Sequence, residues 1–365
     1  MMMAYKAQAE IISPSAGQAR SFDPYDGETV RERLSSHLRR EVDASFEIGP
    51  LRRYTVGFSW VTYGFRATWR ENGRSVERDL ILRAGPPRGI FAPYRASPEF
   101  TALGALAGSG VPVPRVYWFS DDSAAIGAPF FVCDLVPGEA PIPWTRDGGP
   151  AFDDARREGL GGQFVAALAA LHRFKWEGTP AAAIGGSMDA TRAAIDEVTR
   201  WEGLLAMWSP RRIPMLEIAA RWLRRNAPSA RRISIVHGDY RIGNFLEAEG
   251  RITAILDWEL VHLGDPAEDV GWICLQAWRG RSPYMCHFFT REELRDRYAL
   301  LSGIEMSLAD MAYWEAFGAY KLAVMHFGAV HCFEERGFDD LRMAGMGLQI
   351  PRVLLQVESA MERAA

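Results

Sequence analysis

The sequence predicts an α+β fold with two lobes, an N-terminal antiparallel β-sheet lobe followed by a larger, mainly helical C-terminal lobe. Alternating apolar and polar residues between Tyr54 and Arg83, interrupted by the hairpin dipeptide Asn72-Gly73, predict paired strands. After residue 139 the apolar residues recur mainly at helical spacing. The length of 365 residues favours about two domains.

The N-terminal segment is expected to lie outside the sheet. Residues 1–25 follow no regular pattern and are interpreted as an irregular arm. Residues 28–42 carry apolar side chains at helical spacing, which predicts a helix that packs on the first lobe. Residues 1–45 are therefore interpreted as an arm and a helix.

Residues 46–138 are expected to form the sheet lobe. Ser97 is a good helix N-cap and Pro98 suits the first helical turn, so a helix should begin there, after the first strands. Two more strands are expected at 115–119 and 129–135. Together these elements predict strands interrupted by one helix.

Residues 139–365 are expected to form the helical lobe. The break at residues 136–139 separates it from the last strand, and we place a hinge between the lobes near residues 133–138. Helical spacing predicts helices over 161–174, two helices over 191–226 and further helices over 291–365. One small β unit is expected between them.

That β unit ends in a cluster of polar residues. An apolar strand through Val236 is followed by His237-Gly238-Asp239, and Asn244 lies five residues after Asp239. A hairpin over 245–256 then ends at Asp257. Because burying a carboxylate without a partner is costly, polar side chains that converge from one small β unit indicate a functional site.

The spacing of these residues is typical of a phosphoryl-transfer site. A kinase catalytic loop reads H-x-D-x-x-x-x-N, in which the Asp accepts the substrate hydroxyl proton and the Asn binds magnesium. His237, Asp239 and Asn244 have this spacing, and Asp257 stands where a second metal-binding Asp is expected. Magnesium prefers oxygen ligands and takes the rest of its shell from nucleotide phosphates and water.

On these residues the chain resembles the aminoglycoside phosphotransferase family, the small-molecule branch of the protein-kinase-like fold. The resemblance rests on HGDYRIGN at 237–244, LDWE at 256–259 and GDPAEDVGW at 264–272, and it covers roughly residues 50–350. It implies a bilobal protein-kinase-like fold. It also implies ATP-dependent transfer of a phosphoryl group to a small-molecule hydroxyl acceptor, with ATP and Mg²⁺ as cofactors.

The resemblance gives roles to individual residues. Asp239 is expected to be the catalytic base, and Asn244 and Asp257 are expected to hold Mg²⁺. His237 is expected to orient the catalytic loop. Asp269 corresponds to a buried Asp that braces the backbone of this loop.

Other acidic residues nearby have alternative interpretations. Glu259 either supports the metal or faces solvent. Asp265, Pro266 and Glu268 have the pattern of a helix start, with Asp265 as N-cap and Glu268 as its capping-box partner. A structural role is therefore expected for Asp265.

The nucleotide-binding residues are expected in the sheet lobe. The loop at 57–62 would cover the phosphates with the backbone of Gly57 and the hydroxyl of Ser59, although it has fewer glycines than the kinase pattern. Arg83 stands where the third strand carries a phosphate-binding lysine, and a guanidinium is a planar fork rather than a point charge. Glu99 either pairs with Arg83 or complements the positive end of its own helix. GTP is not excluded as the nucleotide.

Composition narrows the class of partner. The net charge of −4 gives no general attraction to nucleic acid or to an anionic membrane. No run approaches the roughly 18 apolar residues of a membrane span, and the N-terminus lacks the apolar core of a signal peptide. The four cysteines are widely spaced without a C-x-x-C pair, which argues against a zinc site or a disulfide framework. A cytoplasmic location is expected.

Two functional hypotheses remain open. The leading one is an ATP-dependent phosphotransferase acting on a hydroxyl of an antibiotic, a metabolite or a hydroxyacyl-CoA. The alternative is a catalytically degenerate, kinase-like ligand-binding protein, which the glycine-poor loop and Arg83 suggest. The set of Asp239, Asn244 and Asp257 favours the enzyme, because a binding protein needs neither a base nor metal ligands. The acceptor and the oligomeric state stay open.

Overall fold

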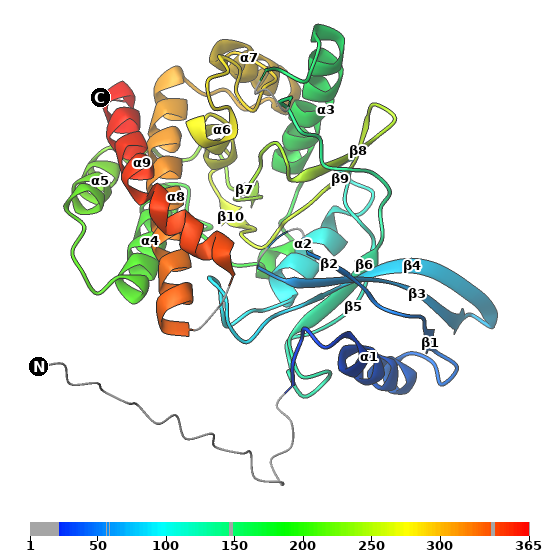
Figure 1. Cartoon of the computed structure of the whole chain (residues 1–365). Coiled ribbons are helices and arrows are strands. Elements are labelled where there is room, and N and C mark those ends of the chain that lie inside the picture. The colour runs from blue at the N-terminus through cyan, green and yellow to red at the C-terminus, as the bar shows by residue number, and fades with distance from the viewer. Residues whose placement is uncertain (1–21, 56, 58, 146–148, 337–339, 365) are drawn as a thin grey trace, which may run out of the picture.

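A computed structural model describes the chain at residues 22–55, 57, 59–145, 149–336 and 340–364. Most of the expected arm at 1–25 lies outside the described residues. The described part confirms the predicted fold class, with an antiparallel sheet in the N-terminal half and helices in the C-terminal half (Figure 1).

The first lobe is built on a six-stranded antiparallel sheet. Its strands are β1 (Glu47–Ile48), β2 (Arg52–Tyr54), β3 (Val61–Glu71), β4 (Arg74–Ala84), β5 (Val116–Ser120) and β6 (Phe130–Asp134). β3 and β4 pair along their whole length around the predicted turn, where Asn72 and Gly73 have φ of 51° and 77°. Both turn positions need positive φ, so the hairpin prediction is confirmed.

The two faces of the sheet pack against different cores. Helix α1 (Gly27–Glu41) covers the outer face, and α2 (Ser97–Leu106) lies on the face toward the helical lobe (Figure 1). In β6, Phe130 belongs to the core shared with α1, whereas its neighbour Phe131 belongs to the core shared with α2. Successive strand residues point to opposite faces, so β6 joins both cores.

The start of α2 differs from the sequence prediction. Ser97 is the first helical residue rather than the N-cap, and Ala96 before it offers no side-chain cap. Oδ1 of Asp121, just after β5, instead accepts hydrogen bonds from the backbone N–H groups of Ala96 and Ser97 at 2.6 and 3.1 Å. The predicted cap at Ser97 is wrong because a carboxylate distant in sequence satisfies these donors.

The second lobe is mainly helical. It contains α3 (Asp154–Arg173), α4 (Ala193–Trp208), α5 (Pro214–Arg225), α6 (Ala267–Ile273), α7 (Arg291–Ser302), α8 (Leu308–Arg336), α9 (Leu341–Ala364) and the short turns η1 (Pro180–Ala183) and η2 (Gln276–Trp278). Gly271 allows α6 and α8 to approach closely, because a Cβ on it would lie 2.4 Å from backbone of Trp314. Among the described helices, none combines the length and the hydropathy that crossing a bilayer requires.

Two short strand pairs position the polar cluster. β8 (Phe245–Ala248) pairs with β9 (Arg251–Ile255), as expected. β7 (Ser234–Val236) pairs with β10 (His262–Gly264), a partner that the sequence pattern did not reveal. Figure 1 shows both pairs between the sheet lobe and the helices.

The chain passes from the first lobe to the second along residues 135–139. At one end, the backbone N–H of Leu135 donates to the carbonyl of Asp79 in β4 at 3.0 Å. At the other end, Glu139 and Glu247 of β8 exchange two backbone hydrogen bonds of 3.0 and 2.9 Å. The expected hinge segment is therefore tied to both lobes, while the domain limits at 1–45, 46–138 and 139–365 stay a prediction.

Candidate active site

The loop at 237–244 follows β7 and turns sharply at Gly238. Gly238 has a φ of +82°, and a Cβ on it would lie 2.6 Å from the carbonyl oxygen of Leu260, so only glycine fits. In the first turn of α6, Asp269 accepts hydrogen bonds from the backbone N–H groups of His237 and Gly238 at 2.8 and 2.9 Å. Asp269 thus contacts the loop backbone as the resemblance implies.

Asp269 is held in turn by His172 of α3. Nε2 of His172 lies 3.1 Å from Oδ2 of Asp269, and its Nδ1 lies 2.7 Å from the hydroxyl of Tyr298. Burial opposes ionisation of Asp269, but the hydrogen bond and charge of His172 outweigh it and hold the pKa of Asp269 below its ordinary value. His172 therefore supports the contact of Asp269 with the loop backbone.

His237 links the loop at 237–244 to the end of β9. Its Nδ1 accepts the backbone N–H of Asp239 at 3.1 Å, and its Nε2 donates to the carbonyl of Leu256 at 2.9 Å. A carbonyl can only accept, so the ring proton lies on Nε2. Burial lowers the pKa of His237, which favours this neutral form. His237 is thus placed to orient backbone rather than to carry a proton.

The carboxylate of Asp239 is held by three donors. Trp272 Nε1 and Arg241 Nε donate to its Oδ1 at 2.7 and 2.9 Å, and Asn244 Nδ2 donates to its Oδ2 at 2.6 Å. The guanidinium of Arg241 also stacks over the ring of Trp278 at 4.5 Å. Because the amide nitrogen of Asn244 donates to both the carboxylate and the backbone carbonyl of Asp239, its amide oxygen points away from that carboxylate.

Asp257 lies at the end of β9 in a strained conformation. Its φ is +66°, which is uncommon for a residue other than glycine, and such conformations recur at functional sites. Its Oδ1 accepts a hydrogen bond of 3.2 Å from Nη2 of Arg83, whose Nη1 donates to Oε1 of Glu99 at 2.5 Å. Of the two interpretations of Glu99, the structure therefore contains the pairing with Arg83.

The surroundings of Arg83 are strongly acidic. Burial raises the pKa of Glu99 to about 7 even though Arg83 lowers it, and burial together with the charge of Asp257 raises the pKa of Glu259 well above its ordinary value. Burial disfavours the charged form of Arg83, but Glu99 and Asp257 outweigh it and raise its pKa. Within the described residues, Oε2 of Glu259 is buried without a hydrogen-bond partner.

This charge pattern suits a divalent cation. One guanidinium faces the carboxyl groups of Glu99, Asp257 and Glu259. The raised pKa values of Glu99 and Glu259 favour their neutral forms, and a cation beside Asp257 would favour the charged ones. Hard carboxylate and amide oxygens are the ligands that Mg²⁺ prefers. The residues present therefore fit the Mg²⁺ ion that the resemblance implies.

The phosphate-covering loop is only partly as expected. Ser59 lines the cavity described below, and its hydroxyl donates to the Tyr94 hydroxyl at 3.1 Å. Gly57 has a φ of +94°, and its carbonyl accepts a hydrogen bond of 3.0 Å from Arg342 of α9. Val61 already belongs to β3, so the expected loop at 57–62 is two residues too long. Phe58 lies outside the described residues.

A cavity of about 340 Å³ connects these groups. Its wall includes Ser59, Asp239 and Asp257 together with residues of α8 and α9. The other expected site residues act through those in the wall. Asn244 contacts Asp239, Arg83 contacts Asp257, Glu99 contacts Arg83, and His237 and Asp269 hold the loop backbone.

The predicted capping box at α6 is wrong. Asp265 does accept a hydrogen bond from the backbone of Ala267 at 2.9 Å. Glu268, however, does not return to the cap, because its carboxylate lies 3.2 Å from Nε2 of His262 and accepts a hydrogen bond of 2.9 Å from Nζ of Lys321. Glu268 thus belongs to a buried polar network rather than to the helix start.

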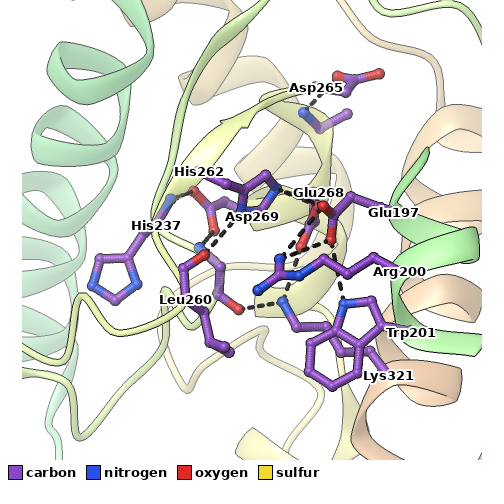
Figure 2. A network of polar contacts seen from close by, with 12 residues as sticks. Glu197, Arg200, Trp201, His237, Leu260, His262, Asp265, Glu268, Asp269 and Lys321 are labelled. Atoms are coloured by element: carbon purple, nitrogen blue, oxygen red, sulfur yellow. Dashed lines mark hydrogen bonds and ion pairs between the residues drawn. The ribbon is translucent and has the colours of Figure 1, made fainter. Parts of the chain in front are cut away.

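Lys321 is a site residue that the sequence analysis missed. It lies fully buried on α8, where its ammonium donates to the carbonyl of Gly238 at 2.6 Å. It also donates to the carboxylate of Glu268 at 2.9 Å, and Figure 2 shows the two side chains together. Burial opposes ionisation of Glu268, but Lys321 and then His262 outweigh it and lower its pKa to about 2. One signal could have revealed this role, since a lone lysine in an apolar helix is rarely buried unless it is paired.

The same network contains a group of possible metal ligands. Ligand atoms of Glu197, His262 and Glu268, from α4, β10 and α6, lie within 4.8 Å of one another (Figure 2). Burial lowers the pKa of His262, but the two glutamates outweigh this effect and raise it, which favours the charged imidazole. With Lys321 at 2.9 Å from Glu268, the network already contains its cations. It is therefore interpreted as a support behind the catalytic loop.

Known proteins resemble this chain in sequence. The model of the phosphotransferase enzyme family matches residues 62–306. Mouse acyl-CoA dehydrogenase family member 10 is 29% identical over 267 residues, which are 69% of this chain and 24% of the mouse protein. Human acyl-CoA dehydrogenase family member 11 is 26% identical over 315 residues, 82% of this chain and 38% of that protein. The chain therefore spans well under half the length of these curated relatives.

Solved structures share the fold. A Ralstonia eutropha protein provisionally assigned as an aminoglycoside phosphotransferase has a TM-score of 0.67 and 24% identity, covering 91% of this chain and 98% of its own. Macrolide 2'-phosphotransferase MphH of Brachybacterium faecium has a TM-score of 0.52 and 18% identity, covering 87% and 97%. Aminoglycoside phosphotransferase APH(4)-Ia, in a ternary complex with AMP-PNP and hygromycin B, has a TM-score of 0.54 and 14% identity, covering 91% and 98%.

Proposed function

Because this chain belongs to the phosphotransferase enzyme family, we propose that it transfers the γ-phosphoryl group of ATP to a hydroxyl of a small molecule with the help of Mg²⁺. The observation that carries this proposal is the carboxylate of Asp239, which three donors fix on the wall of a cavity that Asp257 shares. Phosphoryl transfer depends mainly on such positioning and on electrostatic stabilisation.

Asp239 acts as the base in this proposal. Its Oδ1 already accepts two hydrogen bonds, whereas Oδ2 accepts one from Asn244 among the described residues. The acceptor hydroxyl therefore gives its proton to Oδ2 as its oxygen attacks the γ-phosphorus, and the bond between that phosphorus and the leaving ADP oxygen breaks. Arg241 and Trp272 keep the carboxylate aimed while this happens.

Asn244 and Asp257 would hold Mg²⁺ through the amide oxygen and the carboxylate. The ion supplies neutralisation of phosphate charge when it is bound. Arg83 contacts Asp257 at 3.2 Å but Glu99 at 2.5 Å, so the contact with Asp257 is the weaker of the two. We expect this contact to open when phosphates enter, which leaves Glu99 to hold Arg83 toward them.

The nucleotide is proposed from the fold. APH(4)-Ia, which shares the fold, forms a complex with AMP-PNP, an ATP analogue. ATP is therefore the first donor to test, with GTP as the comparison. The curated relatives are named as acyl-CoA dehydrogenases, but the chain covers only 24% and 38% of their lengths in the two cases above. We do not extend dehydrogenase activity to it.

The competing proposal is a binding protein that has lost catalysis. Arg83 in place of lysine and the short loop around Gly57 and Ser59 favour it. Against it stand the contacts of Asp239, because a binding site has no need for a carboxylate aimed by three donors.

One experiment separates the two proposals. Purified protein is screened for acceptor-dependent ADP release with a library of antibiotic and metabolite alcohols, and thermal shifts with ATP are measured with and without Mg²⁺. Asp239→Asn should keep the Mg²⁺-dependent shift and lose turnover by about a thousandfold or more, whereas Asp257→Ala should lose both. Asp296→Asn, on the exposed side of α7, is the control. Turnover retained by Asp239→Asn would reject the assignment of the base.

A further inference from the structure

Helix α9 contacts both lobes. Its C-terminal half packs on the helical lobe, where Val353 and Val357 are buried in the core. In the same half, Nη2 of Arg363 donates to Oε1 of Glu315, a buried residue of α8, at 3.0 Å. The N-terminal end of α9 instead lies beside the sheet lobe (Figure 1). The helix therefore joins the two lobes at a second place, apart from the chain crossing at 135–139.

Pro351 separates the two halves of α9. A proline in a helix interior lacks the N–H that would donate to the preceding turn, and its ring crowds the carbonyl four residues earlier, so helices bend at this residue. The half at 341–350 can thus follow the sheet lobe while the half after Pro351 stays packed on the helical lobe.

Arg342, in the first turn of α9, contacts the segment between β2 and β3 that carries the expected phosphate-covering loop. Its Nη2 donates to the carbonyl of Gly57 at 3.0 Å, and its Nη1 donates to the carbonyl of Thr55 at 3.3 Å. Asp340 aims the guanidinium, because its carboxylate accepts from Nε at 3.0 Å and from Nη2 at 2.5 Å. A planar fork of donors suits such a contact, since it reaches two carbonyls while a carboxylate holds it.

These contacts bear on how the loop receives phosphates. A peptide group is planar, so holding its carbonyl also sets the direction of its N–H. Loops that cover phosphates bind them largely through backbone N–H groups. Ser59, two residues after Gly57, lines the cavity that Asp239 and Asp257 share. Holding the carbonyls of this segment therefore orders the loop before a nucleotide binds, which reduces the entropic cost of binding.

We propose that Arg342 is a positioning residue for the nucleotide, which holds the phosphate-covering loop from the helical lobe in the orientation that receives the phosphates of ATP. This inference rests on the proposed function. The role differs from that proposed for Arg83, which contacts phosphate with its own side chain. The competing interpretation is an exposed ion pair between Arg342 and Asp340, which would contribute little to stability or binding.

The test compares a ligand that has phosphates with one that lacks them. Binding of AMP-PNP to the full chain is measured by calorimetry in the presence of Mg²⁺, and binding of adenosine is measured by its competition with AMP-PNP. In Arg342→Ala we expect the Kd for AMP-PNP to rise by about three- to tenfold. The Kd for adenosine should change by less than about twofold, because adenosine carries no phosphates for the loop to hold.

Two further variants assign the effect to the guanidinium. Arg342→Lys keeps a positive charge with donors, so its Kd for AMP-PNP should lie between those of Arg342→Ala and the unaltered chain. Arg212→Ala is the matched control, since Arg212 is an exposed arginine of the helical lobe whose guanidinium binds Glu217. Its Kd for AMP-PNP should equal that of the unaltered chain.

The results for the unaltered chain separate this inference from the proposed function. If Arg342→Ala binds AMP-PNP as tightly as the unaltered chain does, or if AMP-PNP and adenosine are weakened equally, the inference is overturned while the kinase proposal stands. If the unaltered chain does not bind AMP-PNP with Mg²⁺, the proposed function fails, and the role of Arg342 falls with it.

Discussion

The indole N–H of Trp272 donates a hydrogen bond of 2.7 Å to Oδ1 of Asp239. Asp269, three residues earlier on the same helix, accepts hydrogen bonds from the backbone of the loop that carries Asp239. Residues three apart lie on one face of a helix. A single turn of α6 therefore fixes both the loop and the carboxylate at its tip, which is the kind of rigid support that a catalytic group requires.

Replacing Trp272 with Phe should slow catalysis without weakening nucleotide binding. The variant keeps a large ring in the core but removes one of the three donors to Asp239, so the carboxylate spends less time in the productive orientation. We expect kcat for acceptor-dependent ADP release to fall by about ten- to a hundredfold, with KM for ATP nearly unchanged. Steady-state kinetics with varied ATP would measure both parameters.

Trp222→Phe is the matched control for this prediction. Trp222 is partly buried on α5 and does not line the cavity, so the same substitution there should leave kcat within about twofold. A kcat for Trp272→Phe equal to that of the control would show that the hydrogen bond to Asp239 does not position the base.

The ion pair between Arg83 and Glu99 predicts an effect on the nucleotide. Glu99→Gln removes the charge that holds Nη1 of Arg83 at 2.5 Å, so Arg83 is left with Asp257 as its charged partner and is drawn away from the phosphates. KM for ATP should rise by about three- to tenfold, with a smaller change in kcat. Glu28→Gln, on the exposed side of α1, controls for the loss of a helix-terminal charge. An unchanged KM for ATP would leave Glu99 only its role at the helix end.

Glu99 also predicts a pH dependence of stability. Burial raises its pKa to about 7 in the folded chain from an ordinary value of 4.5. The folded state thus binds the proton of Glu99 more tightly than the unfolded state does. The stabilisation that this proton gives the folded state is complete below pH 4.5 and is lost as the pH rises through 7. As the pH rises from 5 to 8, the free energy of unfolding of the unaltered chain should fall by about 2–3 kcal/mol relative to that of Glu99→Gln. Urea unfolding of both proteins across this range measures the difference, and a constant difference would contradict the prediction.

The sequence predicted those parts of the structure that depend on local patterns. The Asn72-Gly73 hairpin followed from backbone preference, and the loop carrying Asp239 and Asn244 followed from fixed spacing within one short segment. Asp257 could be placed near them because only one hairpin separates it from Asn244. Their roles in catalysis remain proposals.

The contacts that the sequence did not reveal join distant segments. Asp121 caps a helix that starts 24 residues earlier, and Lys321 binds the carbonyl of Gly238 across 83 positions. Neither strand nor helix periodicity predicts such pairs, because these contacts depend on how helices and strands that are distant in the sequence pack together. Glu268 is an example. Its local sequence pattern predicts a capping box, but its carboxylate contacts the buried His262 and Lys321 instead.

Lys321 predicts a large effect on stability from a single buried charge. In Lys321→Met the apolar stem is roughly preserved, but Glu268 loses its ammonium partner and the carbonyl of Gly238 loses its donor. Removing one member of a buried ion pair leaves the other charge uncompensated, so the free energy of unfolding should fall by about 3–5 kcal/mol. Urea denaturation at pH 7 measures this loss.

Two comparisons make the prediction specific. Lys175→Met removes an exposed lysine and should change the free energy of unfolding by less than about 0.5 kcal/mol. Adding Glu268→Gln to Lys321→Met removes the unpaired charge and should recover part of the lost stability, because a neutral amide costs less to bury than a carboxylate. If Lys321→Met is as stable as Lys175→Met, or if the second substitution only adds to the loss, the ion pair does not support the catalytic loop in the way the structure implies.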